Sequence, residues 1–386
     1  MQRRLWMIHT VLIKYRPNSE LYYSFLDLPD TWYYQQHDAY FNSSLSKYGI
    51  NYIKACIRGK DGYVAGYFEA KVNLARLSGA EGHLAIFSHN MIKMASERFD
   101  SLMDSLSTEE VYPSFYDWLL ARIDYCYDIK TPHTQTYINL LKKGDKPYFL
   151  HLPMDRYGRP IHYKTSLYLL GSGYNVNFYD KNRQLKDTER IEDNDDIEDD
   201  ILRLEIQCHY TKVAYLKKAF DIFVRNLPYY LTEDLSIYVV KKTLKDITRS
   251  ETLEYIRKNK AFERIDQSKH TKKIKSELKQ IISDISKQHS SIWKVRERYE
   301  DEGIMKRQTY NNRLKMLNNL NINPVVLSDN ARIQGLKPKD GLITLYGLFC
   351  GLICTFDFTG EEYFNYLDEM ENLEMEELGE LLSEPI

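Results

Sequence analysis

Hydrophobic and polar residues alternate along much of the first 220 residues. The alternation is clear in NYIKACIRG, GYVAGYFEAKVNLARL, ARIDYCYDI, SLYLLG and ILRLEIQCHY. A period of two is typical of β-strands that bury one face. Single helix-like segments such as TQTYINLLKK lie between these stretches. Strands interrupted by single helices predict an α+β fold in which a largely antiparallel sheet comes first.

After about Leu231 the hydrophobic period becomes helical. The stretch SKHTKKIKSELKQIISDISKQ places one apolar stripe among lysines, formed by Ile274, Leu278, Ile281, Ile282 and Ile285. A helix, Gly303 and a second helix from near Thr309 follow, in the pattern of a helix-turn-helix. We therefore expect a sheet domain over residues 1–230, a smaller helical domain over 231–330, and a C-terminal segment over 331–386.

The charge of the chain is unevenly distributed. Its 386 residues carry a net charge of only −2, but residues 241–320 hold 21 Lys and Arg against 11 Asp and Glu. Residues 356–386 hold 11 acidic residues and no basic one. The helical domain is thus expected to attract a polyanion, and the acidic tail to repel one.

Two features bear on where the protein resides. The five cysteines are scattered without zinc-site spacing, which favours a reducing, cytoplasmic setting. The longest apolar run, LITLYGLFCGLICTF from Leu342 to Phe356, is shorter than the roughly 20 residues of a membrane-spanning helix. We expect no membrane partner, and a buried helix or hairpin in this run.

Three strands carry polar residues that could support chemistry. Tyr179 alternates with apolar neighbours in GSGYNVNFYDKNRQL, and Lys181 follows two residues later. The other two strands carry the pairs Arg122 with Asp124 and Arg203 with Glu205. Buried carboxylates must be paired or bound to a cation, and their oxygens suit Mg²⁺ or Mn²⁺. Spacing alone leaves open cross-strand ion pairs, Asp124 with Arg203 and Glu205 with Arg122, and a purely packing role for Tyr179.

An ordered set of motifs over about residues 7–220 resembles a known family. The motifs are YFEAKVNLARLSG, RIDYCYD, LYLLGSGYNVNFYDKNRQL and LRLEIQCHYTKVAYLKK. Together they resemble the rolling-circle replication initiators of the filamentous-phage gene II/X type and, more distantly, the Rep_trans initiators of small plasmids. The resemblance implies an endonuclease and strand transferase that nicks one DNA strand at the origin through a 5′-phosphotyrosine intermediate and later religates it.

The resemblance also implies roles for individual residues. Tyr179 corresponds to the nucleophile and Lys181 to the lysine that follows it. Asp124 and Glu205 correspond to acidic positions that would hold a divalent metal, Mg²⁺ or Mn²⁺. No His-hydrophobe-His pair is present, so metal binding would depend on these carboxylates.

Origin DNA is the expected partner, both as duplex and as single strand. Arg122 and Arg203 are expected to contact DNA at the sheet. In the second helix of the helix–Gly–helix pattern, the expected duplex-binding residues are Lys306, Arg307, Asn311, Asn312, Arg313 and Lys315. A host helicase and a second copy of the chain are further candidate partners. Two alternatives stay open: a mobilisation relaxase with the same chemistry, and a non-enzymatic origin-binding protein.

Overall fold

The structure is a computed structural model, and it describes most of the chain up to residue 354. The described residues are 7–56, 66–80, 87, 91–107, 110–187, 201–333, 335–337 and 340–354. The acidic tail expected over residues 356–386 lies outside them.

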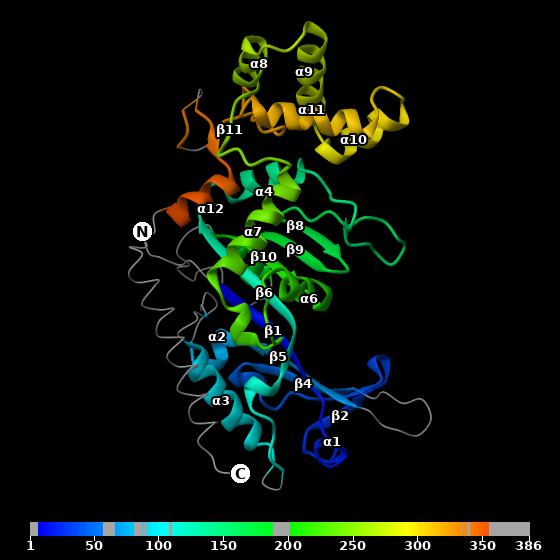
Figure 1. The fold of residues 1–386 in the computed structure, drawn as a ribbon, viewed down its shortest axis with the longest axis vertical. Coiled ribbons are helices and arrows are strands. Elements are labelled where there is room, and N and C mark those ends of the chain that lie inside the picture. The colour runs from blue at the N-terminus through cyan, green and yellow to red at the C-terminus, as the bar shows by residue number, and fades with distance from the viewer. Residues whose placement is uncertain are drawn as a thin grey trace.

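A ten-stranded antiparallel sheet forms the centre of the molecule (Figure 1). It confirms the predicted α+β class and the largely antiparallel sheet. β1 is inserted between β5 and β6, so the first strand of the chain joins the two halves of the sheet. The strands in spatial order are β2 (Thr31–Tyr34), β3 (Ala39–Asn42), β4 (Ile50–Cys56), β5 (Tyr67–Asn73), β1 (Met7–Tyr15), β6 (Leu119–Lys130), β10 (Ile201–Cys208), β9 (Tyr174–Asp180), β8 (Ser166–Gly171) and β7 (Leu150–His151).

The two faces of the sheet differ in chemistry because side chains alternate along each strand. One face is apolar and fully buried, and it includes Val11, Ile123, Ile206 and Phe178. The opposite face carries the charged residues of β6 and β10. Burying one continuous apolar face fixes the register, since a shift by one residue would expose every core side chain.

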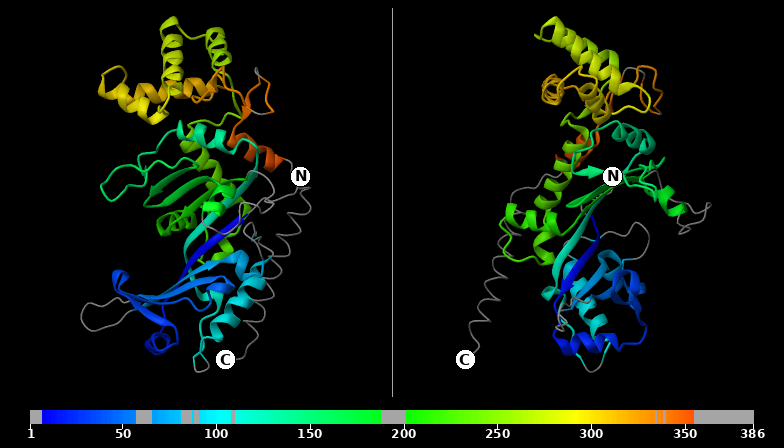
Figure 2. Two further views of the ribbon diagram at one scale, coloured as in Figure 1. Left: turned by 180° about the vertical axis from the view of Figure 1, so that it is seen from behind. Right: turned by 90° about the vertical axis from the view of Figure 1, so that its right-hand side faces the viewer.

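Helices cover the apolar face. They include α1 (Ser19–Leu26), α2 (Leu74–Leu77), α3 (Ile92–Asp104), α4 (Thr134–Lys142), α6 (Tyr210–Ala219) and α7 (Glu233–Thr248). The hydroxyl of Tyr127 on β6 bonds to that of Ser236 on α7 at 2.7 Å. α6 and α7 lie on one side of the sheet, and α5 (Lys181–Asp187) lies on the other (Figure 2). α7 is therefore part of the sheet unit, although residue 231 was the expected start of the helical domain.

The helical unit begins after α7 and contains four further helices. They are α8 (Lys258–Gln267), α9 (Lys272–Ser286), α10 (Ile292–Asp301) and α11 (Arg307–Asn319). The predicted stripe on α9 is buried, with Leu278, Ile281, Ile282 and Ile285 fully covered and Ile274 partly so. Gly303 has a φ of +68°, which glycine adopts readily, and it ends α10 before α11. The helix–turn–helix order is as expected.

The apolar run near the C-terminal end of the described chain forms β12 (Leu342–Ile343) and α12 (Leu345–Cys354). β12 pairs with β11 (Glu254–Tyr255), and α12 packs near α7. Among the described residues, no helix has the length and hydropathy needed to cross a membrane.

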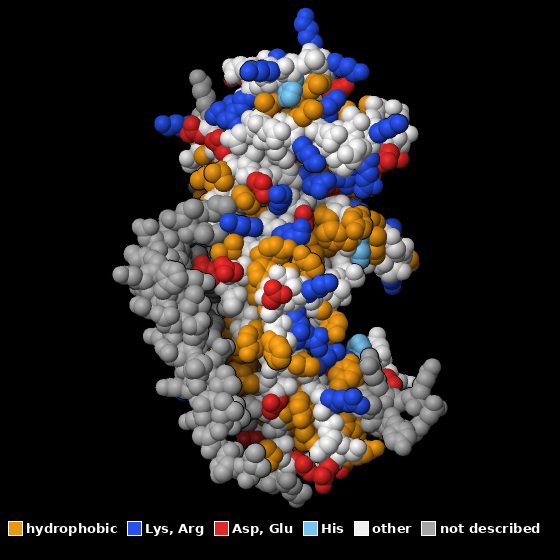
Figure 3. Space-filling view, viewed as in Figure 1, with side chains coloured by type: hydrophobic (Ala, Val, Ile, Leu, Met, Phe, Trp, Pro, Cys, Tyr) orange, Lys and Arg blue, Asp and Glu red, His pale blue; other side chains and the backbone are white. Residues whose placement is uncertain are grey.

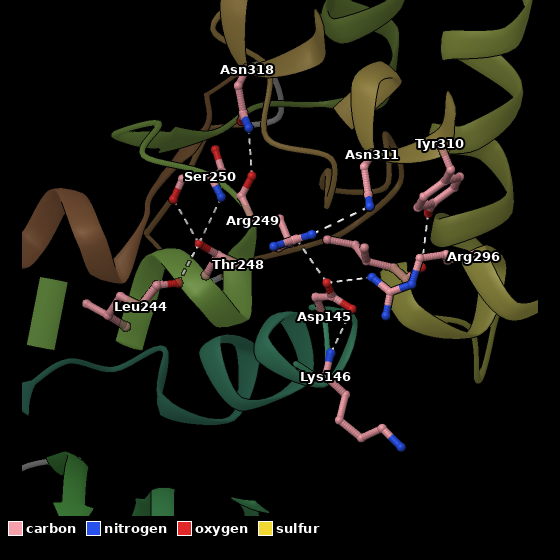
Figure 4. Close-up of polar contacts among 11 residues, drawn as sticks. Asp145, Lys146, Leu244, Thr248, Arg249, Ser250, Arg296, Tyr310, Asn311 and Asn318 are labelled. Atoms are coloured by element: carbon pink, nitrogen blue, oxygen red, sulfur yellow. Dashed lines mark hydrogen bonds and ion pairs between the residues drawn. The ribbon is translucent and has the colours of Figure 1, made fainter. Parts of the chain in front are cut away.

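A short segment after α4 joins the helical unit to the sheet unit (Figure 4). The Asp145 side chain is only 2% exposed, and its Oδ2 accepts from Arg296 of α10 at 2.7 Å and from Arg249 at 2.9 Å. Lys143 donates through Nζ to three carbonyl groups at the end of α9, at 2.8 to 3.2 Å. Gly144 is required between them, because a Cβ there would lie 2.6 Å from the carbonyl oxygen of Ile247. One buried carboxylate thus pairs with two guanidinium groups, one on the C-cap residue of α7 and one on α10.

We expect Asp145→Ala to destabilise the protein strongly, because it would leave Arg296 buried without its counter-ion. Loss of one partner of a buried ion pair costs about 3–5 kcal/mol. The free energy of unfolding in urea is the measurement. Glu251→Ala is the matched control, since Glu251 pairs with Lys245, both side chains are more than half exposed, and exposed pairs contribute about 0–1 kcal/mol. Equal losses in the two variants would contradict the role of Asp145.

Candidate active site

The polar face of the sheet brings together the acidic, basic and phenolic residues predicted from the sequence. Because β10 lies between β6 and β9, cross-strand pairing sets Arg203 beside both Asp128 and Tyr179. The same register sets Glu205 opposite Asn177. We call this group the polar cluster: Arg122, Asp124 and Asp128 on β6, Asn177 and Tyr179 on β9, and Arg203 and Glu205 on β10.

Tyr179 is the phenol of the polar cluster and is 9% exposed. Its hydroxyl donates a hydrogen bond to Oε2 of Glu205 at 3.2 Å. Burial, followed by the charge of Glu205, raises the pKa of Tyr179 well above its usual value of about 10. The phenol is therefore neutral at pH 7, and any attack by its oxygen requires removal of the proton.

Arg203 is the cation nearest to Tyr179 in the sheet register, and it is 1% exposed. Its guanidinium forms two hydrogen bonds with Asp128, at 2.6 and 2.7 Å. The positive charge of Arg203 acts to lower the pKa of Tyr179, against burial and Glu205. This environment differs from the DNA contact expected for Arg203, because a buried and doubly bonded guanidinium does not face solvent.

Arg122 and Asp124 pair with each other within β6. Both carboxylate oxygens of Asp124 accept from the Arg122 guanidinium at 2.7 Å. The cross-strand alternative of Asp124 with Arg203 and Glu205 with Arg122 is not the arrangement observed. Burial of the carboxyl raises the pKa of Asp124 to about 6, although Arg122 acts in the opposite direction.

Asp124 and Glu205 are not equally suited to bind a divalent ion. Asp124 has both oxygens on Arg122, so this arrangement does not fit a metal bridged by Asp124 and Glu205. Next to Glu205, the buried Oδ1 of Asn177 has no hydrogen-bond partner, and amide and carboxylate oxygens are suitable ligands for Mg²⁺. Within the part of the chain that the structure describes, no group of three or more His, Cys, Asp or Glu side chains is arranged to hold a metal ion.

Lys181 is the first residue of α5 and is 4% exposed. Its ammonium lies 6.0 Å from the centre of the Tyr179 ring and donates to Gln184 at 2.8 Å. The strand ends at Asp180, so Lys181 reaches the phenol from the start of a helix. The predicted proximity of Lys181 to Tyr179 is observed.

His9 is a member of this environment that the sequence analysis did not single out. The pairing of β1 with β6 is shifted between Ile8 and Val11, which indicates a bulge at His9 and Thr10. Burial and then the charge of Arg203 lower the pKa of His9 to about 4; Glu205, Lys181 and Asp128 act on it more weakly. Its neutral ring is a hydrogen-bonding group close to the polar cluster. The sequence signal is a histidine among the mostly apolar residues of β1.

The residues predicted to bind duplex DNA divide into two groups on α11. Lys306, Arg307, Asn312 and Lys315 are exposed. Arg313 instead donates from Nε to Glu277 of α9 at 2.7 Å, and Asn311 accepts from Arg249 at 3.5 Å. The base-contacting role expected for Arg313 conflicts with this ion pair, whereas the exposed residues are available to a ligand.

A pocket of about 380 Å³ lies between α11 and the end of α7. It is lined by Lys245, Arg249, Asn311, Lys315 and Asn318, among others. α11 therefore faces the sheet unit along one side (Figure 1). Basic side chains gather over the helical unit (Figure 3), so the surplus of Lys and Arg seen in the sequence is displayed on its surface.

His9 predicts a specific acid sensitivity. Its pKa is lower in the folded chain than the value of about 6.5 in an unfolded one, so its contribution to stability is full above pH 6.5 and is lost as the pH falls towards 4. The loss amounts to roughly 1.4 kcal/mol per pH unit. We expect His9→Gln to flatten the fall in unfolding free energy between pH 6.5 and 4.5, measured with urea. His162→Gln, in an exposed loop, is the control; identical curves for wild type and His9→Gln would contradict the assignment.

A comparison with models of protein families found no match for this chain, and a comparison with curated proteins found none. The function of the protein is therefore inferred from the polar cluster and the helical unit themselves.

Proposed function

We propose that the protein initiates rolling-circle replication by nicking one strand of origin DNA with Tyr179 and later religating it. The observation that carries the proposal is the hydrogen bond from the Tyr179 hydroxyl to Glu205, beside Arg203 and Lys181. The ordered motifs that resemble rolling-circle initiators motivate the choice of substrate. The cytoplasm is the compartment that this function requires.

Glu205 provides the acceptor for the phenolic proton. In the cleavage step, the Tyr179 oxygen forms a bond to phosphorus while the bond from phosphorus to the 3′ oxygen breaks. The phenolic proton passes to Glu205, and the released 3′ oxygen takes a proton from water. The ester retains the energy of the broken bond, so the reverse attack by a 3′ hydroxyl restores the strand and frees Tyr179.

Two cations reduce the cost of charge in this buried site. Arg203 lies directly beside Tyr179 in the sheet register, and the Lys181 ammonium lies 6.0 Å from the centre of the Tyr179 ring. Positive charge at these positions stabilises the phenolate oxygen as it forms, and fixed charges act strongly where water is excluded. Asp128 holds Arg203 in place through two hydrogen bonds.

A divalent ion, Mg²⁺ or Mn²⁺, remains part of the proposal. Glu205 and Asn177 are the residues that would hold it, and Asp124 would join them only after releasing Arg122. Such an ion would neutralise charge on the scissile phosphate.

The helical unit is proposed to bind origin duplex through the exposed residues of α11. Lys306 and Arg307 lie at the start of that helix, where a phosphate would also meet free backbone N–H groups. Recruitment of a host helicase and pairing with a second copy are further proposals for this unit. The Asp145 junction keeps it close to the sheet that would cut the strand.

A second candidate is a non-enzymatic origin-binding protein. The saturated pairs Arg122–Asp124 and Arg203–Asp128 favour it, because they satisfy the buried charges without any substrate. In that case, the sheet would act as scaffold and only the helical unit would bind DNA. A mobilisation relaxase with the same tyrosine chemistry differs from the first proposal in the origin that it cuts.

We expect Tyr179→Phe to abolish the covalent protein–DNA adduct while leaving the fold intact. The change removes one oxygen and keeps the ring, so packing on β9 is preserved. The measurement is a denaturing gel after incubation of the full chain with a labelled single-stranded origin oligonucleotide. Glu205→Gln should lower the rate of adduct formation about 100-fold or more, the usual contribution of a positioned proton acceptor.

Tyr210→Phe is the control for this experiment, because Tyr210 is exposed at the start of α6 and lies outside the polar cluster. A normal adduct yield with Tyr179→Phe would assign the nucleophile elsewhere, with Tyr174 and Tyr210 next to test. If the wild type forms no adduct on any strand of the parent replicon, the non-enzymatic candidate is favoured. A chelating agent in the same assay tests the metal, since full activity without divalent ions would remove Mg²⁺ and Mn²⁺ from the proposal.

For the helical unit, we expect Lys306→Ala with Arg307→Ala to weaken binding to all duplexes alike. Each lost phosphate contact should reduce the slope of log K against log salt by about 0.9. Asn312→Ala should instead reduce the preference for origin over random duplex, by about 1–3 kcal/mol if it contacts a base. Arg313→Ala is the control, because its guanidinium is bound to Glu277. If only Arg313→Ala reduced the preference for origin duplex, the assignment of base contact to Asn312 and of a structural role to Arg313 would be wrong.

A further inference from the structure

Aromatic side chains form an exposed surface on the hairpin at the far edge of the sheet. Trp32 on β2 is 48% exposed and Tyr34 is 36% exposed. The Trp32 ring stacks on Phe41 of β3 at 5.3 Å between centroids, and Phe41 contacts Tyr52 of β4 edge-on at 5.6 Å. We call Trp32, Tyr34, Phe41 and Tyr52 the aromatic platform. Contiguous exposed apolar groups often mark a binding site.

The aromatic platform lies on the same face of the sheet as the polar cluster. Directly paired residues share a face, and the pairs can be followed from strand to strand. Trp32 pairs with Phe41, and Phe41 pairs with Lys54. From Tyr52, the pairing continues through Lys71 and Leu12 to Arg122. One face therefore leads from the platform to the residues beside Tyr179.

Basic side chains occupy the strands between the two groups. Lys54 places its ammonium 6.0 Å from the centre of the Phe41 ring, and Lys71 and Lys14 follow on β5 and β1. The carboxylate among these positions, Glu69, is paired with Lys14 at 3.0 Å and with Lys54 at 3.8 Å. Three lysines against one glutamate leave this stretch of the face positively charged.

We propose that the aromatic platform binds single-stranded DNA and directs it along this face to Tyr179. Unpaired bases would stack on Trp32 and Phe41, and phosphates would lie near Lys54 and Lys71. Flat aromatic groups next to lysines favour this occupant over a duplex, whose bases are already stacked, and over an apolar protein surface. The choice of DNA as the strand rests on the proposed function.

The sheet geometry gives the length of strand that the face can hold. β2 and β9 are seven strand spacings apart in the sheet order, which corresponds to about 34 Å at about 4.8 Å per spacing. At the roughly 3.4 Å spacing of stacked bases, this distance holds about 10 nucleotides. An oligonucleotide of about 16 nucleotides would reach both sites, and one of about 5 nucleotides would not.

The test is a direct binding measurement that requires no cleavage. Fluorescence anisotropy with labelled oligothymidylate of about 16 nucleotides should show that Trp32→Ala and Phe41→Ala each weaken binding by the full chain about 5- to 100-fold, the usual effect of one stacked base. Tyr33→Ala is the matched control: Tyr33 lies on the same hairpin and is 47% exposed, but it pairs with Tyr40 on the opposite face. Binding by Tyr33→Ala should be unchanged.

Lys54→Gln provides a second variant that leaves the aromatic rings in place. It should reduce the slope of log K against log salt by about 0.7, the value for one phosphate of a single strand. Equal affinities for wild type, Trp32→Ala, Phe41→Ala and Lys54→Gln would overturn the platform. So would a sedimentation experiment in which Trp32→Ala abolishes a dimer without changing DNA affinity, since the occupant would then be a second copy.

The binding test of the aromatic platform can fail or succeed independently of the adduct test of Tyr179. An adduct at Tyr179 combined with unchanged affinities would remove the platform and keep the nicking activity. Weaker binding by Trp32→Ala without any adduct in the wild type would keep the platform and remove the nicking activity.

Discussion

The polar face of the sheet depends on the buried ion pair between Arg203 and Asp128. A guanidinium removed from water is costly unless its hydrogen bonds and charge are matched, and Asp128 supplies both across the strand pair. This pair fixes β10 beside β6, and β10 in turn holds Glu205 against Tyr179. Arg122 and Asp124 form a second ion pair within β6 itself, with Asp124 four residues before Asp128. The polar cluster therefore holds two ion pairs, Arg203–Asp128 and Arg122–Asp124, and one carboxylate that accepts a hydrogen bond from a phenol. That combination distinguishes the candidate site from an ordinary solvated sheet face.

Much of the fold could be predicted because local patterns determine it. Alternation identified β6, β9 and β10, and a helical stripe identified α9, since burial of one face is visible in a single segment. The partners of charged residues could not be predicted in the same way. Asp124 bonds within its own strand to Arg122, and Arg313 bonds to a helix 36 residues away in the chain. His9 was missed because a bulge, which no alternation predicts, turns it towards the polar cluster. Long-range register and helix docking decide these contacts.

The sheet unit and the helical unit share one counter-ion, Asp145. Arg249 is the C-cap residue of α7 in the sheet unit, and Arg296 belongs to α10 in the helical unit, yet both pair with the same buried oxygen. Separation of the units would leave at least one of these charges unpaired. Under the proposed function, a duplex held by α11 and a strand held by the sheet would be kept close together, as a nick near a recognised duplex would require.

The position of β1 in the sheet constrains the order in which the chain can fold. β1 and β5 can pair once about 73 residues have been synthesised, but the other edge of β1 must wait for β6, which begins at Leu119. β6 then keeps an open edge until β10 has been made, up to Cys208. Open edges of this kind favour pairing between chains. Such distant partners also slow folding, because loops must close before the contacts form. During synthesis, β6 therefore keeps one edge without its partner strand until residues 201–208 have been made.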